Sequence, residues 1–310
     1  MVLLKNDGIL PLDKTKIKTI GVIGPNANNR RCLVGNYEGT ASEYVTLLEG
    51  IKAEAGEDCR VLYSEGCHLF KEKVENLGIE NDRQAELLSV CEASDVIVLC
   101  MGLDSGLEGE EGDEGNAYAS GDKPNLELPG LQQQVVDMAV STGKPVVLVL
   151  VAGSALALTK SSHEVSAFLY AGYPGAQGGN AVAQVLFGKH SPEGKLPITF
   201  YKTSEELPAF TDYAMKGRTY RYMKNEALYP FGVGLGYSDF ELSEVKLSSD
   251  KVTGEGVDIE LDVTNTGSCD CAYVIQVYVK YESEGTPNPT LKAFKKVRLA
   301  KGEKKHVSLK

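Results

Sequence analysis

Apolar residues follow two different patterns along the chain. In the first two-thirds, short runs of aliphatic residues alternate with segments whose apolar residues recur at helical spacing. The runs predict strands at residues 17–23, 60–63, 95–101, 145–151 and 167–170. The segments between them predict helices at residues 43–54, 83–93, 131–140 and 178–187. Because uninterrupted apolar strands need cover on both faces, this part is expected to be α/β, with a mainly parallel sheet in an α/β/α sandwich.

The helical pattern ends near residue 237. Residues 257–263 and 273–279 then alternate between apolar and polar side chains, with a turn signal, Asn-Thr-Gly, at 265–267. Such short alternating strands predict an immunoglobulin-like β-sandwich. A complete sandwich of this kind has roughly 100 residues, so the shorter stretch predicts a partial, apparently truncated one. The expected domains are therefore 1–237 and 238–310.

Composition excludes several classes of protein. Hydrophobic residues make up 42% and charged residues 24%, which is typical of a globular chain and not of a disordered or fibrous one. The net charge of −11 disfavours binding to nucleic acid, because an acidic surface repels the phosphate backbone. No apolar run reaches the roughly 20 residues that span a bilayer, so no membrane association is expected.

Cysteines, histidines and glycines give no sign of a metal or a cofactor. The seven cysteines are scattered, and Cys269-Asp-Cys271 lacks a second pair at zinc spacing. The glycines at residues 21–24 do not follow the G-x-G-x-x-G spacing of dinucleotide-binding loops. Reduced thiols, together with a first segment unlike a secretory signal, predict a cytoplasmic protein with neither metal nor cofactor.

Ligands of parallel α/β sheets bind at the carboxyl ends of the strands. The loops after Ile23, Met101, Val151 and Tyr170 are therefore the places where a site is expected. For two of these loops the sequence favours a purely structural role. Gly153-Ser154-Ala155 fits a tight turn better than a hydrolase serine, and residues 172–179 fit a packed glycine-rich turn. Aromatic residues at 218–222 and 229–237 form either a carbohydrate-stacking surface or, as their place at the domain boundary favours, a linker packed between domains.

The loop at residues 102–130 is the most unusual segment. It follows a buried strand, is far longer than a typical connection, and interleaves glycines with acidic residues, seven of them before residue 123. The regular oxygen ladder of a calcium loop is absent. Two readings remain open: a solvated acidic flap, or a loop that delivers one carboxylic acid to an active site, since neighbouring like charges raise a Glu pKa toward a value useful to a general acid. These seven are Asp104, Glu108, Glu110, Glu111, Asp113, Glu114 and Asp122.

Several motifs in a fixed order resemble one enzyme family. They are VLLKNDGILPL (2–12), GNY (35–37), LEGEE (107–111), GD (121–122), LPG (128–130), PVVLVL (145–150), AGYPG (171–175), GKLP (194–197), GRTY (217–220) and YPFG (229–232). Together they resemble the C-terminal α/β/α domain of glycoside hydrolase family 3, the β-glucosidases and β-xylosidases. VTNTG (263–267) and QVYV (276–279) resemble part of the fibronectin type III-like domain of that family.

The resemblance implies half of a retaining mechanism. Glu110 best matches the family's general acid/base, and Glu108 and Glu111 are the alternates. The nucleophilic Asp of the family lies on a (β/α)8 barrel, which would have to be supplied by another domain or chain. The substrates implied are β-glucoside or β-xyloside oligosaccharides, and the chain alone is expected to be inactive. Lys123 stands where the family has Arg, which puts the contacts of that side chain in doubt.

A second hypothesis comes from a different class of function. The chain would be a non-catalytic carbohydrate-binding or scaffold fragment that docks on another protein. In either case the face that would pack on a barrel is expected to be exposed, so self-association is a further expectation.

Overall fold

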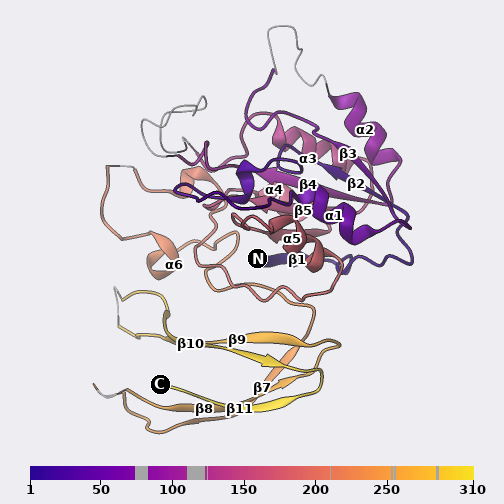
Figure 1. Cartoon of the computed structure of the whole chain (residues 1–310). Coiled ribbons are helices and arrows are strands. Elements are labelled where there is room, and N and C mark those ends of the chain that lie inside the picture. The colour runs from indigo at the N-terminus through magenta and orange to yellow at the C-terminus, as the bar shows by residue number, and fades with distance from the viewer. Residues whose placement is uncertain are drawn as a thin grey trace.

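The computed structural model of the chain describes every residue except 74–82, 110–122, 124, 210, 253, 255, 284 and 285. Its described residues form an α/β domain followed by a smaller domain of antiparallel strands (Figure 1). This confirms the expected fold class, a mainly parallel sheet in an α/β/α sandwich followed by a fibronectin-like β-region.

A six-stranded sheet with the order β1-β6-β5-β4-β2-β3 forms the centre of the α/β domain. Strands β2 to β6 run parallel, whereas β1 pairs antiparallel with β6 at the edge. Every residue of β4, β5 and β6 is buried, as parallel strands covered on both faces require. The strands are β1 (Val2–Asn6), β2 (Thr19–Ile23), β3 (Arg60–Ser64), β4 (Val96–Gly102), β5 (Val146–Val151) and β6 (Ala167–Tyr170).

Helices cover both faces of the sheet. Helices α1 (Leu47–Ala55) and α5 (Gly178–Leu186) bury one apolar cluster on one face. Helices α2 (Gln84–Glu92), α3 (Gln132–Ser141) and α4 (Thr159–Glu164) flank the second cluster on the other face. The α1–α5 contact depends on small residues, because a Cβ on Gly179 would lie 1.9 Å from the carbonyl oxygen of Thr46.

Helix α1 begins at Leu47, four residues after the start that the apolar spacing predicts. Thr46 is its N-cap: the Glu49 amide donates to Thr46 Oγ1 at 3.3 Å, and the Thr46 amide donates to Glu49 Oε2 at 2.8 Å. This reciprocal capping box satisfies amides that would otherwise lack a partner, and so it sets the start of the helix.

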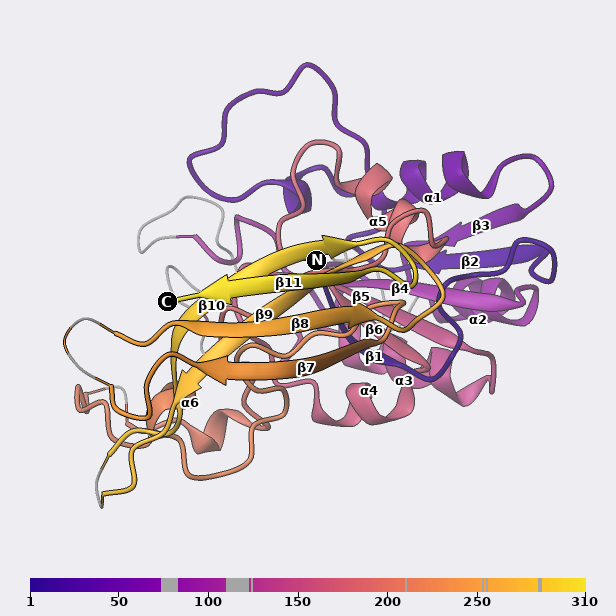
Figure 2. The same cartoon turned by 90° about the horizontal axis from the view of Figure 1, so that it is seen from below.

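The second domain packs two antiparallel sheets around a small core (Figure 2). One sheet has the order β11-β8-β7, and β9 and β10 form the other. The two segments expected as strands around the Asn-Thr-Gly turn, β8 and β9, therefore lie in different sheets. The strands are β7 (Phe240–Leu247), β8 (Ile259–Asn265), β9 (Cys271–Val279), β10 (Thr290–Leu299) and β11 (Lys304–Leu309).

Glu193 joins the two domains. The amide of Ala272 in β9 donates to Glu193 Oε1 at 3.0 Å, and Lys296 and Arg298 of β10 form ion pairs with its carboxylate at 2.7 and 3.0 Å. The Glu193 side chain is only 14% exposed. A carboxylate that accepts a hydrogen bond from an amide and neutralises two cations fixes β9 and β10 against the α/β domain.

The remaining helical turns are η1 (Arg31–Leu33), η2 (Ser204–Glu206) and α6 (Thr219–Tyr222).

Candidate functional site

The loops that follow β4, β5 and β6 meet at one edge of the sheet. These strands are parallel neighbours, so Gly102 lies beside Val151, and Leu150 lies beside Tyr170. Gln132 fixes the end of β4, since its buried side-chain amide accepts from the Gly102 amide at 2.7 Å and donates to the Gly102 carbonyl at 2.8 Å. This is the edge where a site is expected from the sequence.

Asp104 shapes the turn after β4. Its Oδ1 accepts hydrogen bonds from the amides of Gly106 at 2.9 Å and Leu107 at 3.1 Å. Its backbone carbonyl accepts from the amide of Glu108 at 3.1 Å. The buried Asp104 therefore folds the chain back on itself and presents Glu108 at the edge of the sheet.

The carboxylate of Glu108 accepts hydrogen bonds from two other loops. The Gly153 amide donates to Oε2 at 2.6 Å, and the Ser154 hydroxyl donates to Oε1; both follow β5. The Tyr173 hydroxyl, from the loop after β6, donates to Oε2. Both oxygens are thus engaged by groups fixed at the ends of buried strands.

The charge of Glu108 acts on the ionisable groups around it. Burial, and then this charge and its hydrogen bond, raises the pKa of Tyr173 above its ordinary value. Burial and the same charge raise the pKa of Tyr170 to about 12. Burial lowers the pKa of Lys123, whereas the charge of Glu108 acts in the opposite direction. Lys123 donates to the Ala155 carbonyl at 3.1 Å, so its ammonium group lies close to this site.

Only one of the three candidate acid/base residues lies in the described part of the chain. Glu108 is placed at the carboxyl edge of the sheet, whereas Glu110 and Glu111 fall outside the described residues. The sequence reasoning missed Gly153, Ser154 and Tyr173 as partners of Glu108. Their position after adjacent parallel strands was the available signal.

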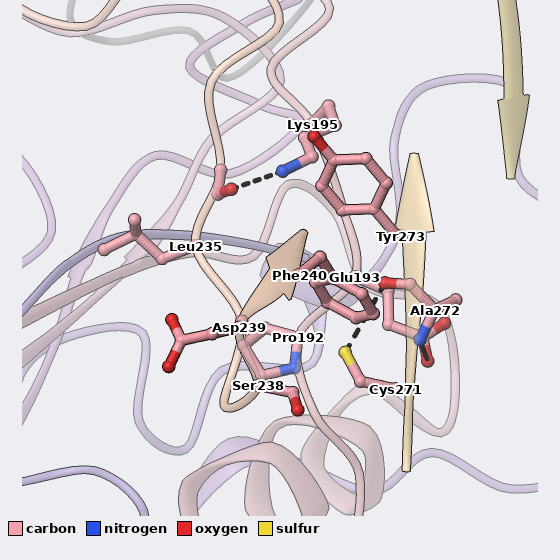
Figure 3. A pocket seen from close by; sticks show the side chains of 12 residues that line it. Pro192, Glu193, Lys195, Leu235, Ser238, Asp239, Phe240, Cys271, Ala272 and Tyr273 are labelled. Carbon is pink, nitrogen blue, oxygen red and sulfur yellow. Dashed lines mark hydrogen bonds between the residues drawn. The ribbon is translucent and has the colours of Figure 1, made fainter. Parts of the chain in front are cut away.

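Several cavities lie among the described residues, and three of them border the domain joint or the edge that carries Glu108. One of about 210 Å³ lies at the joint between the domains, where Figure 3 shows Lys195 donating to the carbonyl of Gly234 near Tyr273. A polar one of about 390 Å³, lined by Asn28, His68 and others, shares Asp104 with the turn before Glu108. A third, of about 620 Å³, adjoins Gly153 and Ser154 and so lies beside Glu108.

The described residues hold neither a cluster of metal ligands nor a helix that could span a membrane. No group of three or more His, Cys, Asp or Glu side chains there is arranged to hold a metal ion. None of the helices in that part of the chain has the length and apolarity needed to cross a membrane. All seven cysteines are free, and burial raises the pKa of the Cys32 and Cys67 thiols to about 12.

An α/β/α sandwich with a carboxylate at the carboxyl edge of its sheet, followed by a fibronectin-like β-region, is the arrangement that the sequence motifs implied. The chain belongs to glycosyl hydrolase family 3: the model of the family's C-terminal domain matches residues 1–237, and that of the fibronectin type III-like domain matches residues 273–310. The resemblance seen in the sequence motifs is thereby confirmed.

Similar proteins are named as glycosidases. A β-xylosidase of Formosa agariphila is 34% identical over 325 residues, which cover 100% of this chain and 43% of that protein. A periplasmic β-glucosidase of Salmonella typhimurium is 35% identical over 339 residues, covering 99% of this chain and 43% of that protein. The solved structure of a β-glucosidase from Erythrobacter marinus superposes with a TM-score of 0.81 at 30% identity, covering 99% of this chain and 43% of that one. The chain thus spans less than half the length of these relatives.

Proposed function

We propose that this chain is the acid/base-bearing half of a retaining β-glycosidase that releases terminal, non-reducing β-linked glucose or xylose. The observation that carries the proposal is the Glu108 carboxylate, which is fixed at the carboxyl edge of the sheet. Glu108 lies near the start of the loop at residues 102–130, here called the acidic segment. Membership of family 3 and the names of the similar β-xylosidase and β-glucosidase support the substrate class.

The proposed reaction needs two carboxyl groups on either side of one sugar. An Asp on a (β/α)8 barrel attacks the anomeric carbon while the acid/base Glu gives its proton to the leaving oxygen. The same Glu, now a carboxylate, then takes a proton from the water that releases the sugar from the Asp ester. The two carboxyl groups stand roughly 5–5.5 Å apart in enzymes of this type.

Glu110 is the residue that we assign as the acid/base, with Glu108 and Glu111 as alternates. The contacts of Glu108 bear on its suitability as the acid/base in two ways. Its carboxylate is rigidly placed at the expected edge, as an acid/base residue must be. Both its oxygens, however, accept hydrogen bonds, so proton donation by Glu108 would first require exchange of the Ser154 or Tyr173 contact.

Three single variants in an enzyme reconstituted with a barrel test the proposal. The variant of the true acid/base, among Glu108→Gln, Glu110→Gln and Glu111→Gln, should lose orders of magnitude in rate on alkyl glycosides. It should lose far less on nitrophenyl glycosides, whose leaving group needs little protonation. Added azide should restore its turnover as a glycosyl azide. If all three variants kept full activity on alkyl glycosides, the acidic segment would not supply the acid/base.

Three further expectations remain proposals. They are a domain boundary at 237/238, a cytoplasmic location, and self-association of the isolated chain through the face that would meet a barrel. Cell fractionation of the native protein and light scattering on the purified chain test the last two.

A further inference from the structure

The cavity of about 620 Å³ beside Ser154 has four walls. The turn after β5 forms one wall, residues 197–201 form the second, α6 with the chain before it forms the third, and Phe231 forms the fourth. The lining includes Ser154, Ile198, Met215, Tyr220, Arg221 and Phe231.

This cavity shares a wall with the Glu108 site. Gly153 and Ser154 line the cavity, and the same two residues donate hydrogen bonds to the Glu108 carboxylate. A ligand in the cavity would therefore be separated from that carboxylate by a single turn of chain. The cavity is in the right place for one part of a substrate whose scissile bond lies at the carboxyl edge of the sheet.

The walls suit an apolar group better than a sugar ring. The Tyr220 and Phe231 rings stack with centroids 4.2 Å apart and planes at 11° to each other, and Met215 and Ile198 add apolar surface. Arg221 is the one charged side chain among the described residues that line it. An aromatic or aliphatic group needs only a matching apolar surface, and the Arg221 guanidinium can stack on an aromatic ring.

The β-sandwich domain holds two of these walls in place. The side-chain amide of Asn288 donates to the carbonyls of Tyr220 at 2.9 Å and Met223 at 2.8 Å. The side-chain amide of Gln276 in β9 donates to the carbonyl of Gly232, next to Phe231, at 2.9 Å. These hydrogen bonds, which come from the β-sandwich domain, therefore fix the backbone that carries the stacked Tyr220 and Phe231 rings.

Thr219 shows that this wall is constrained. Its φ is 56°, a left-handed conformation that is costly for a β-branched residue. The Thr219 amide donates to the Tyr201 hydroxyl at 2.8 Å, which helps to hold that conformation across the cavity. Backbone strain of this kind is typical of binding sites, where the surrounding structure fixes a shape that the chain alone would not adopt.

We propose that this cavity receives the aglycone of a β-glycoside, an aromatic or branched aliphatic leaving group, and that Asn288 is a positioning residue for it. The inference rests on the proposed glycosidase function, and it adds which part of the substrate this chain recognises. Turnover should then favour glycosides with a bulky apolar leaving group over simple sugar disaccharides.

Direct binding to the 310-residue chain tests the cavity without any turnover. Phenyl β-glucoside should bind at least about tenfold more tightly than methyl β-glucoside in calorimetry or ligand-observed NMR. Tyr220→Ala should remove this preference, and Asn288→Ala should weaken it while leaving the fold intact. Tyr213→Ala is the matched control, because Tyr213 is 87% exposed and does not line the cavity. Met215→Glu, at a half-exposed position that tolerates charge, should abolish the preference even if Tyr220→Ala unfolds the chain.

Kinetics in the reconstituted enzyme separate the two proposals. Met215→Glu should raise KM for phenyl β-glucoside about tenfold and leave KM for methyl β-glucoside unchanged. Normal turnover with no preference for the phenyl glycoside would overturn the aglycone assignment and leave the glycosidase function standing. A preference in binding without turnover by any reconstituted enzyme would support the cavity and refute the glycosidase function. If Met215→Glu weakened association with the barrel and not phenyl glucoside binding, the cavity would be a docking surface and the assignment would be wrong.

Discussion

The amide nitrogen of Gly153 lies 2.6 Å from Oε2 of Glu108, although 45 residues separate them in the chain. The two residues follow β4 and β5, which are neighbouring parallel strands. The sheet therefore brings Glu108, at the end of the turn after β4, into contact with the turn after β5. This relationship makes Gly153 part of the site through its backbone and not through any side chain.

Gly153→Ala should disturb the site directly. A Cβ there would lie 2.9 Å from Tyr173 Cε2 and 3.1 Å from Glu108 Oε2, so one of these side chains must move. We expect a loss of about 1–3 kcal/mol in the free energy of unfolding, measured by urea titration. Gly39→Ala is the control, because a Cβ on Gly39 meets nothing within 4 Å. Equal stability of the two variants would show that the close approach of the two loops is not maintained in solution.

Tyr173→Phe should isolate the hydroxyl that donates to Glu108. The ring stays in place, but one hydrogen bond to a carboxylate is lost in a partly buried site. The free energy of unfolding should fall by about 1.5 kcal/mol. Tyr213→Phe removes a hydroxyl from a residue that is 87% exposed, and it should change the unfolding midpoint very little. An unchanged midpoint for Tyr173→Phe would mean that water replaces the tyrosine hydroxyl without cost.

The central parallel strands β4, β5 and β6 could be predicted because each is a run of apolar residues that must be buried on both faces. Strand β1 escaped prediction because it is a short edge strand, and only its pairing with β6 identifies it. Strand β7 escaped because its apolar alternation shifts by one position between Leu242 and Val245, where the pairing with β8 is also irregular. The start of α1 was readable, since Thr46 and Glu49 have capping-box spacing, but apolar spacing alone placed it too early.

The candidate site was predictable only as a location. The rule that ligands bind at the carboxyl ends of parallel strands identified the loops after β4, β5 and β6. It could not identify Ser154 and Tyr173 as partners of Glu108, because such pairings depend on how loops 46 and 65 residues apart are folded against each other. No period or motif in the sequence encodes that contact.

Glu193 should make the domain joint sensitive to acid. Burial alone would raise its pKa, but the hydrogen bonds from Lys296 and the Ala272 amide, with the charges of Lys296 and Arg298, bring it below its usual value. The folded state thus binds the proton less readily than the unfolded state. The ionised carboxylate stabilises the fold above pH 4.5, and this contribution is lost as the pH falls through the lower folded-state pKa.

Glu193→Gln checks this dependence. At about pH 7 the variant should be less stable than the parent chain, and the difference should shrink as the pH falls below about 4.5. Unfolding midpoints in urea at several pH values measure it. Glu226→Gln, which breaks an ion pair in which Glu226 is 87% exposed, should differ little from the parent at any pH. A constant difference between Glu193→Gln and the parent chain across this range would mean that the ion pairs of Glu193 do not couple to folding.

The isolated chain should hydrolyse no glycoside at an enzymatic rate. Retaining hydrolysis needs a nucleophile and an acid held on opposite sides of one sugar ring. This chain presents Glu108 at one edge of its sheet, and the nucleophile that the proposed reaction requires lies on a barrel. A second carboxylate from the same segment is a poor substitute, because the two groups must stand on opposite sides of the sugar and a misplacement of about 1 Å can cost a hundredfold in rate. Purified chain incubated with nitrophenyl β-glucoside and β-xyloside, alone and then with a separately expressed barrel, measures this. Turnover by the chain alone that a point variant within it abolishes would refute the half-enzyme proposal and require a nucleophile among its own residues.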